Sequence, residues 1–160
     1  MYSIYNHIWG LLMDLINKNL ITLELNTSDK EDTILELAKL LEKENRINNL
    51  ESYIECVNER ENLIDTSMGS NIAIPHGKSD SVDIPSLAFA KTKDYIRWGE
   101  DKNSLVDKIF MIAVPTKYES NEYLKILAGI SRKLANSEFR EKLSNADDKE
   151  SIYELIKSAF

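Results

Sequence analysis

The sequence is poor in the residues that build disulfides and metal sites. It contains one cysteine, Cys56, and only two histidines, His7 and His76. A single cysteine excludes an internal disulfide, and this favours a reducing, cytoplasmic setting. Zinc sites need clusters of cysteine, histidine or carboxylate ligands, so two histidines far apart in the sequence argue against a metal site.

Basic charge and long hydrophobic stretches are also scarce. The net charge is −7, which argues against nucleic acid as the main partner, because phosphate-backbone binding needs a basic face. No apolar stretch reaches the roughly 18 residues that would span a bilayer. The first basic residue is Lys18, which does not fit the basic start of a secretory signal. We interpret residues 1–12, which include His7, as an extension, a misassigned start or an extra helical turn before a single domain at 13–160.

Apolar and polar residues repeat with the periods of both strands and helices. The alternating or continuous apolar stretches predict strands at 21–25, 71–75, 86–90, 95–98 (as a short edge strand) and 108–115 (as a central strand). The patterns with a period near 3.6 predict helices that begin at a Ser28–Glu31 cap and at 49–61, 120–135, 137–146 and 147–160, the last capped by Asp147 and Glu150. This alternation predicts an α/β sandwich, in which a mixed sheet is flanked by helices on both faces.

The stretch NIAIPHGKSD places His76 at the end of a predicted strand, between Pro75 and Gly77. Proline has a fixed φ and no N–H, so it stiffens the approach to the histidine. Glycine leaves room for a large anion beside the ring, and Lys78 and Ser79 add donors. A neutral imidazole is an able nucleophile toward a phosphoryl group. The alternative is that His76 is a hydrogen-bonded surface residue with no chemical role.

Arg60 continues the apolar stripe of the predicted 49–61 helix by one step, so it can point into the domain. Its fork of donors suits the oxygens of a phosphoryl group. The alternative is a solvated arginine that pairs with Glu59 or Glu61. Cys56 lies in the middle of the same helix and is interpreted as structural. The sequence contains no G-x-S-x-G or P-loop pattern, which argues against a serine hydrolase and against nucleotide binding by that route.

Four blocks of the chain resemble one known family. The stretch MGSNIAIPHGKSDSV, 68–82, is similar to the phosphohistidine signature of the enzyme IIA domains of the bacterial sugar phosphotransferase system, fructose/mannitol class. LVDKIFMIAVP, 105–115, resembles a strand of its fructose-type members, residues 16–41 are similar to their N-terminal region, and residues 123–156 are similar to their C-terminal helices. The resemblance covers residues 13–160.

The resemblance implies a mixed sheet flanked by helices and a fructose-like phosphocarrier. His76 would accept a phosphoryl group from the phosphocarrier HPr and pass it to a cysteine of an enzyme IIB domain, which serves a IIC membrane component. Arg60 matches the active-site arginine of the family, and Gly77 and Lys78 flank the phosphorylated ring. No metal, nucleotide or other cofactor is implied. Two alternatives stay open: a regulatory module that signals through protein binding, and a domain that keeps the fold without the chemistry.

Tyr123 marks a departure from the family. Members of the class usually carry a second active-site histidine in an H-L-x-x-L pattern, whereas this chain reads YLKIL, 123–127. A tyrosine hydroxyl can donate a hydrogen bond to a phosphoryl oxygen, but it carries no positive charge at neutral pH. We expect less electrostatic support for the phosphorylated state. The alternative is that Tyr123 only packs at the rim of the site.

Overall fold

The structure is a computed structural model that describes residues 15–118 and 120–160. Its strands are β1 (Ile21–Leu25), β2 (Ile72–Ala73), β3 (His76–Ser79), β4 (Ser86–Arg97) and β5 (Leu105–Pro115). Its helices are the short 3-10 helix η1 (Lys18–Leu20), α2 (Lys30–Lys43), α3 (Leu50–Leu63), α4 (Ser120–Leu134), α5 (Ser137–Asn145) and α6 (Lys149–Lys157). His7 and the residue range 1–12, on which the sequence analysis placed an extension, lie outside the described residues.

The five strands form one mixed sheet with β5 at its centre. The order is β1-β4-β5-β2. β3 lies on the same side of β5 as β2 and pairs with the later residues of β5, from Ile112 to Pro115. β4 is antiparallel to β5, whereas β2 and β3 are parallel to β5 and β1 is parallel to β4. β5 is buried along almost all of its length, as expected for a strand covered on both faces. The predicted central strand is confirmed.

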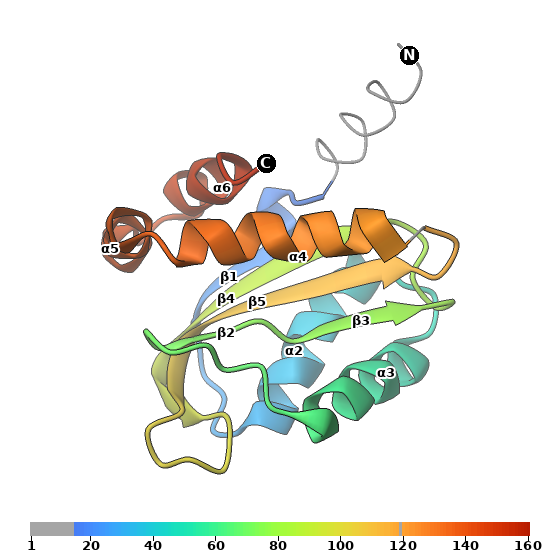
Figure 1. Ribbon diagram of the computed structural model, residues 1–160, viewed down its shortest axis with the longest axis horizontal. Coiled ribbons are helices and arrows are strands. Elements are labelled where there is room, and N and C mark those ends of the chain that lie inside the picture. The colour runs from blue at the N-terminus through green and yellow to red at the C-terminus, as the bar shows by residue number, and fades with distance from the viewer. Residues whose placement is uncertain (1–14, 119) are drawn as a thin grey trace.

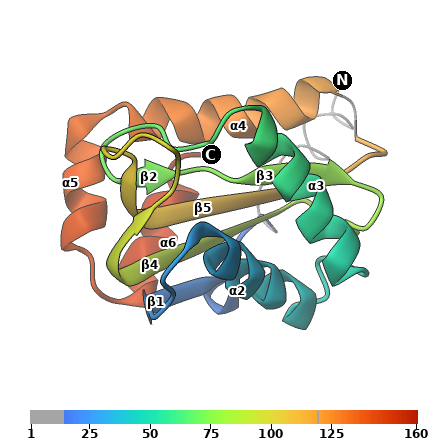
Figure 2. The same cartoon turned by 90° about the horizontal axis from the view of Figure 1, so that it is seen from below.

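Helices cover both faces of this sheet. α2 and α3 pack on one face, and α4, α5 and α6 lie on the other, as the two views in Figure 1 and Figure 2 show together. The predicted α/β sandwich with a mixed sheet and a single domain in the described residues is therefore confirmed. No helix in the described ranges is long and apolar enough to cross a membrane.

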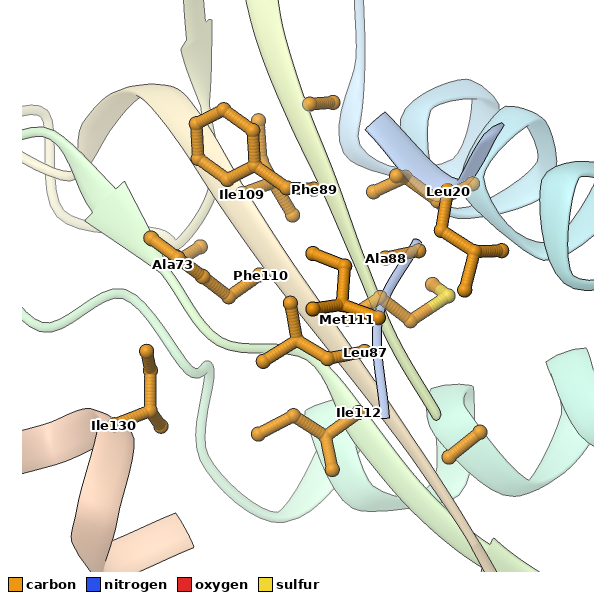
Figure 3. Packing of buried hydrophobic residues seen from close by; sticks show 14 of the residues in the cluster. Leu20, Ala73, Leu87, Ala88, Phe89, Ile109, Phe110, Met111, Ile112 and Ile130 are labelled. Atoms are coloured by element: carbon orange, nitrogen blue, oxygen red, sulfur yellow. The ribbon is translucent and has the colours of Figure 1, made fainter. Parts of the chain in front are cut away.

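The core consists of apolar side chains from the inner strands and the helices above and below them. Phe89 of β4 lies opposite Phe110 of β5, with ring centroids 4.8 Å apart. Leu87, Met111 and Ile112 are fully buried beside this pair, and Figure 3 shows them packed around β4 and β5. At about 25 cal/mol per Å² of buried apolar surface, this layer supplies the main driving force for the fold.

Three local predictions need correction. The predicted strands at 86–90 and 95–98 form one strand, β4, whose register with β5 shifts between Lys91 and Ile96. β4 lies between β1 and β5, but β1 pairs with it only as far as Thr92, so its last residues pair with β5 alone. The N-cap of α2 is Asp29, whose carboxylate accepts the Asp32 N–H, not Ser28. The N-cap of α6 is Asp148, not Asp147. Each cap lies one residue beyond the prediction because an adjacent side chain offers the same capping oxygen.

Candidate functional site

The sequence predicted that His76 follows a strand, but the structure shows that it begins one, as the first residue of β3. The predicted strand at 71–75 is reduced to Ile72 and Ala73. Pro75 separates β2 from β3, since it has no N–H to donate, but its carbonyl accepts the Ile112 N–H at 3.0 Å. β3 then pairs with β5 from His76 onward. The histidine is thus anchored to the central strand of the sheet.

The His76 ring is largely enclosed, with 7% of the residue exposed. Its Nδ1 lies 2.8 Å from the Ile74 carbonyl oxygen. Because a carbonyl only accepts, Nδ1–H is the donor, and the neutral ring carries its lone pair on Nε2. No hydrogen bond joins Nε2 to another described residue. The ring therefore presents a defined nucleophilic nitrogen.

Burial is the main cause of a lowered pKa at His76, because desolvation disfavours the imidazolium. The hydrogen bond to Ile74 acts in the opposite direction and raises the pKa. The Arg60 charge lowers the pKa and the Glu61 charge raises it. The net lowering keeps the imidazole neutral near pH 7, the state in which Nε2 can attack phosphorus.

Gly77 is explained by packing against α3. A Cβ at this position would lie 3.2 Å from Cys56 Sγ, 3.3 Å from Val57 Cγ2 and 3.4 Å from Tyr53 Cε2. The missing side chain therefore lets β3 approach the helix closely. Since side chains alternate along a strand, His76 and Lys78 point to the opposite face, toward α4.

Cys56 is held beneath β3. Its Sγ lies 3.3 Å from the Lys78 carbonyl oxygen, to which the thiol donates. Burial, followed by the charge of Glu59, raises the pKa of the Cys56 thiol. A thiol that resists ionisation is a poor nucleophile, so these contacts support the structural interpretation of Cys56.

Tyr123 lies across from His76 in the first turn of α4. Their ring centroids are 6.0 Å apart, and the rings are tilted by 52°. The side chain is half-buried, and desolvation is the main cause that raises the pKa of Tyr123 to about 12, while the Arg60 charge lowers it. The hydroxyl is therefore protonated, and available as a neutral donor, throughout the physiological pH range.

Arg60 lies in the last turn of α3 and is half-buried. One guanidinium nitrogen donates to the Ile64 carbonyl at 2.8 Å. Its charge lowers the pKa of both His76 and Tyr123, so it contributes to the electrostatics of both rings. Among the described residues, Arg60 forms no ion pair with Glu59 or Glu61. The structure therefore does not show the ion pair with Glu59 or Glu61 that the alternative interpretation of Arg60 requires.

Lys78 contributes a half-buried ammonium-bearing side chain two residues beyond His76 on the same face of β3. The spacing along a strand is about 6.6 Å over two residues, within the reach of a lysine stem. The structure thus places Tyr123 beside His76, with Arg60 acting on both through its charge, and Gly77 and Lys78 following His76 on β3.

Sequence reasoning missed Glu61 and Thr66. Glu61 is 4% exposed and accepts hydrogen bonds from the Thr66 N–H, at 3.1 Å, and from the Thr66 hydroxyl. The signal was available, because Tyr53, Val57 and Glu61 follow one another at intervals of four and all three are buried. An acidic residue that extends a buried stripe indicates a specific partner. No group of three or more metal-ligating side chains occurs among the described residues.

Comparisons with known proteins place the whole domain in one family. Residues 14–159 match the family model described as "Phosphoenolpyruvate-dependent sugar phosphotransferase system, EIIA 2". The chain is 32% identical over 145 residues to a fructose-specific EIIABC component of the phosphotransferase system from Bacillus subtilis, covering 91% of this chain and 23% of that protein. It is also 32% identical over 137 residues to a fructose-specific EIIA component from Haloferax volcanii, covering 86% of this chain and 88% of that one.

A solved structure supports the same assignment. The crystal structure of the nitrogen regulatory protein IIA-Ntr from Neisseria meningitidis superposes with a TM-score of 0.82 at 26% identity, covering 89% of this chain and 97% of that chain. The chain spans about a quarter of the length of the Bacillus relative but most of the length of the Haloferax protein. By sequence match and by fold, the chain belongs to the EIIA domains of the phosphoenolpyruvate-dependent sugar phosphotransferase system, fructose/mannitol class, whose members are phosphotransferase components.

Proposed function

We propose that His76 of this EIIA domain is a transient phosphoryl acceptor, loaded by the phosphocarrier HPr and unloaded by a cysteine of an enzyme IIB domain. The observation that carries the proposal is the hydrogen bond from Nδ1–H to the Ile74 carbonyl, which places the free lone pair on Nε2. The relay would take place in the cytoplasm and would serve a IIC component in the membrane. The Bacillus relative, named as an EIIABC component, supports an association of A, B and C units.

The two transfer steps balance without a cofactor. In the first, Nε2 of His76 attacks the phosphorus of the phosphohistidine of HPr. The new N–P bond forms as the N–P bond of the donor breaks, and the donor imidazole leaves with the electron pair. In the second, the thiolate of the IIB cysteine attacks the same phosphorus, and Nε2 recovers its lone pair. An N–P bond is labile enough for this exchange.

The surrounding side chains act on the charge of the phosphoryl group. Catalysis of phosphoryl transfer consists mainly of positioning and of neutralising the oxygens. The guanidinium of Arg60 supplies a positive charge that already acts on His76 and Tyr123. Tyr123 supplies a neutral hydroxyl, and Lys78 a second cation on the same face of β3. Gly77 keeps β3 close to α3, so that the backbone of the neighbouring His76 stays paired with Ile112 of β5.

A phosphorylation assay tests the proposal. The chain is incubated with enzyme I, HPr and phosphoenolpyruvate, and labelled phosphate on the protein is measured. Wild type should gain one acid-labile phosphate per chain, and His76→Ala should gain none. The proposal fails if wild type gains no phosphate, or if His76→Ala gains as much as wild type.

A second candidate function is a phosphorylation-dependent regulator. It is favoured by the likeness to the structure titled as the nitrogen regulatory protein IIA-Ntr and by the tyrosine at position 123. Mixing the phosphorylated chain with cysteine-bearing IIB domains separates the two functions. Loss of the label to a IIB domain indicates transport, whereas a label that persists with all of them indicates regulation.

A further inference from the structure

The last turn of α3 carries a buried carboxylate next to the candidate site. Glu61 is 4% exposed, and burying a carboxylate is costly unless charges and donors surround it. Lys30 Nζ lies 3.6 Å from its Oε2. The Thr66 N–H donates to Oε2 at 3.1 Å, and the Thr66 hydroxyl donates to Oε1. Both donors of Thr66 are therefore bound to α3 through a single carboxylate.

Thr66 in turn supports the chain that leads into His76. Its carbonyl accepts the Ile74 N–H at 3.1 Å, and the neighbouring Ser67 forms an isolated antiparallel bridge with Ala73. Ala73 also pairs with β5, so the 66–67 segment and β5 lie on opposite edges of β2. The Glu61 carboxylate thus stabilises the outer edge of the segment before the histidine.

This outer edge controls the carbonyl that binds the imidazole. Ile74 donates its N–H to Thr66 and accepts the Nδ1–H of His76 at 2.8 Å. The next carbonyl, that of Pro75, points to β5 and accepts the Ile112 N–H. The β5 ladder therefore holds residue 75, whereas Thr66 holds residue 74. A displacement of Thr66 would turn the Ile74 carbonyl away from Nδ1.

We propose that Glu61 is a positioning residue for His76, which acts through Thr66 and the Ile74 carbonyl to keep the ring proton on Nδ1 and the lone pair on Nε2. The value of this arrangement for catalysis rests on the proposed function, in which Nε2 attacks phosphorus. Glu61 forms no bond to phosphorus and transfers no proton. Lys30, at the start of α2, lies 3.6 Å from the carboxylate and balances its charge.

The test uses Glu61→Gln, which retains the shape of the side chain but loses the charge and one acceptor. Thr66→Val is a second, independent variant that removes only the hydroxyl donor. Glu59→Gln is the matched control, since Glu59 is exposed two residues earlier on the same helix. ¹⁵N NMR of the His76 ring at about pH 8, above its pKa, reports which nitrogen carries the proton. Phosphorylation by HPr and thermal melting are measured on the same samples.

Wild type and Glu59→Gln should show protonated Nδ1 and equal rates. Glu61→Gln and Thr66→Val should show a mixture of the two tautomers, with phosphorylation about tenfold slower, the lower end of the loss seen when the hydrogen-bond partner that orients a metal-bound histidine is removed. A purely structural role would lower the melting temperature and leave the tautomer unchanged. Wild-type ¹⁵N shifts in either folded variant overturn the proposal, and if Glu61→Gln does not fold, Thr66→Val decides. Should wild type take no phosphate, the proposed function fails, while the NMR comparison still decides the role of Glu61.

Discussion

Replacing Gly77 by alanine tests whether close packing of β3 on α3 keeps His76 in place. The added Cβ would meet Cys56 Sγ, Val57 Cγ2 and Tyr53 Cε2 at 3.2, 3.3 and 3.4 Å. Optimal contacts of a carbon atom begin at about 3.5 Å, so the contacts with Cys56 and Val57 are too short by a few tenths of an ångström, whereas the contact with Tyr53 is close to ordinary. Overpacking of this kind costs about 1–3 kcal/mol. For a chain of this size, each kcal/mol lowers the melting temperature by about 2–4 °C.

A substitution at Cys56, whose Sγ lies nearest to the added methyl group, tests whether this close contact causes the loss of stability. Cys56→Ala removes the Sγ atom that lies closest to the new methyl group, so the double variant should recover about 1 kcal/mol relative to the sum of the single variants. Gly69→Ala is the matched control, because Gly69 has φ +82° and no atom within 4 Å of its Cβ position. Its cost is backbone strain, which Cys56→Ala cannot relieve.

Thermal or denaturant unfolding of wild type, the three single variants and the two double variants with Cys56→Ala provides the measurement, with phosphorylation as a second readout. Gly77→Ala should also slow phosphorylation, because any shift of β3 moves the adjacent His76. The packing argument would be refuted by a Gly77→Ala variant as stable as wild type, or by equal recovery of Gly69→Ala and Gly77→Ala.

Two further predictions concern the chemistry of the site. Tyr123→Phe should slow phosphoryl transfer by about ten- to a hundredfold, since one hydrogen bond to a charged group contributes about 1.5–3 kcal/mol, and Tyr123→His should at least preserve the rate. Equal rates for wild type and Tyr123→Phe in a rapid-quench assay would show that the hydroxyl has no role. Phosphorylation by HPr should be independent of pH above about 7 and decline only in more acidic solution, because burial places the pKa of His76 below 6.5 and the reactive form is the neutral one. The charged or titratable groups near the ring are Tyr123, Arg60, Glu61 and Lys78, of which Arg60 lowers and Glu61 raises the pKa of His76, and a midpoint above 7 would contradict the reasoning.

The periodicity of the sequence determined the architecture and the buried faces. Ile34, Leu37, Ala38 and Leu41 repeat at helical spacing and are all fully buried in α2. The apolar stretch before Pro115 became the central strand, because a strand covered on both faces buries the side chains of consecutive residues. Element boundaries were less certain, since neighbouring carboxylates such as Asp147 and Asp148 compete for the same cap.

For the candidate site, the sequence by itself determined that His76 stands next to Pro75 and Gly77, and that Arg60 ends a helical stripe. Only the tertiary structure decided why the glycine is there, which ring nitrogen is free and which carboxylate lies behind the histidine. Gly77 packs against Cys56 of α3. Glu61 of α3 binds Thr66, and Thr66 in turn binds Ile74, so these contacts join three separate segments of the chain. Local periodicity contains no information about such pairings, because they depend on how the strands align on β5 and on how closely α3 packs beneath them.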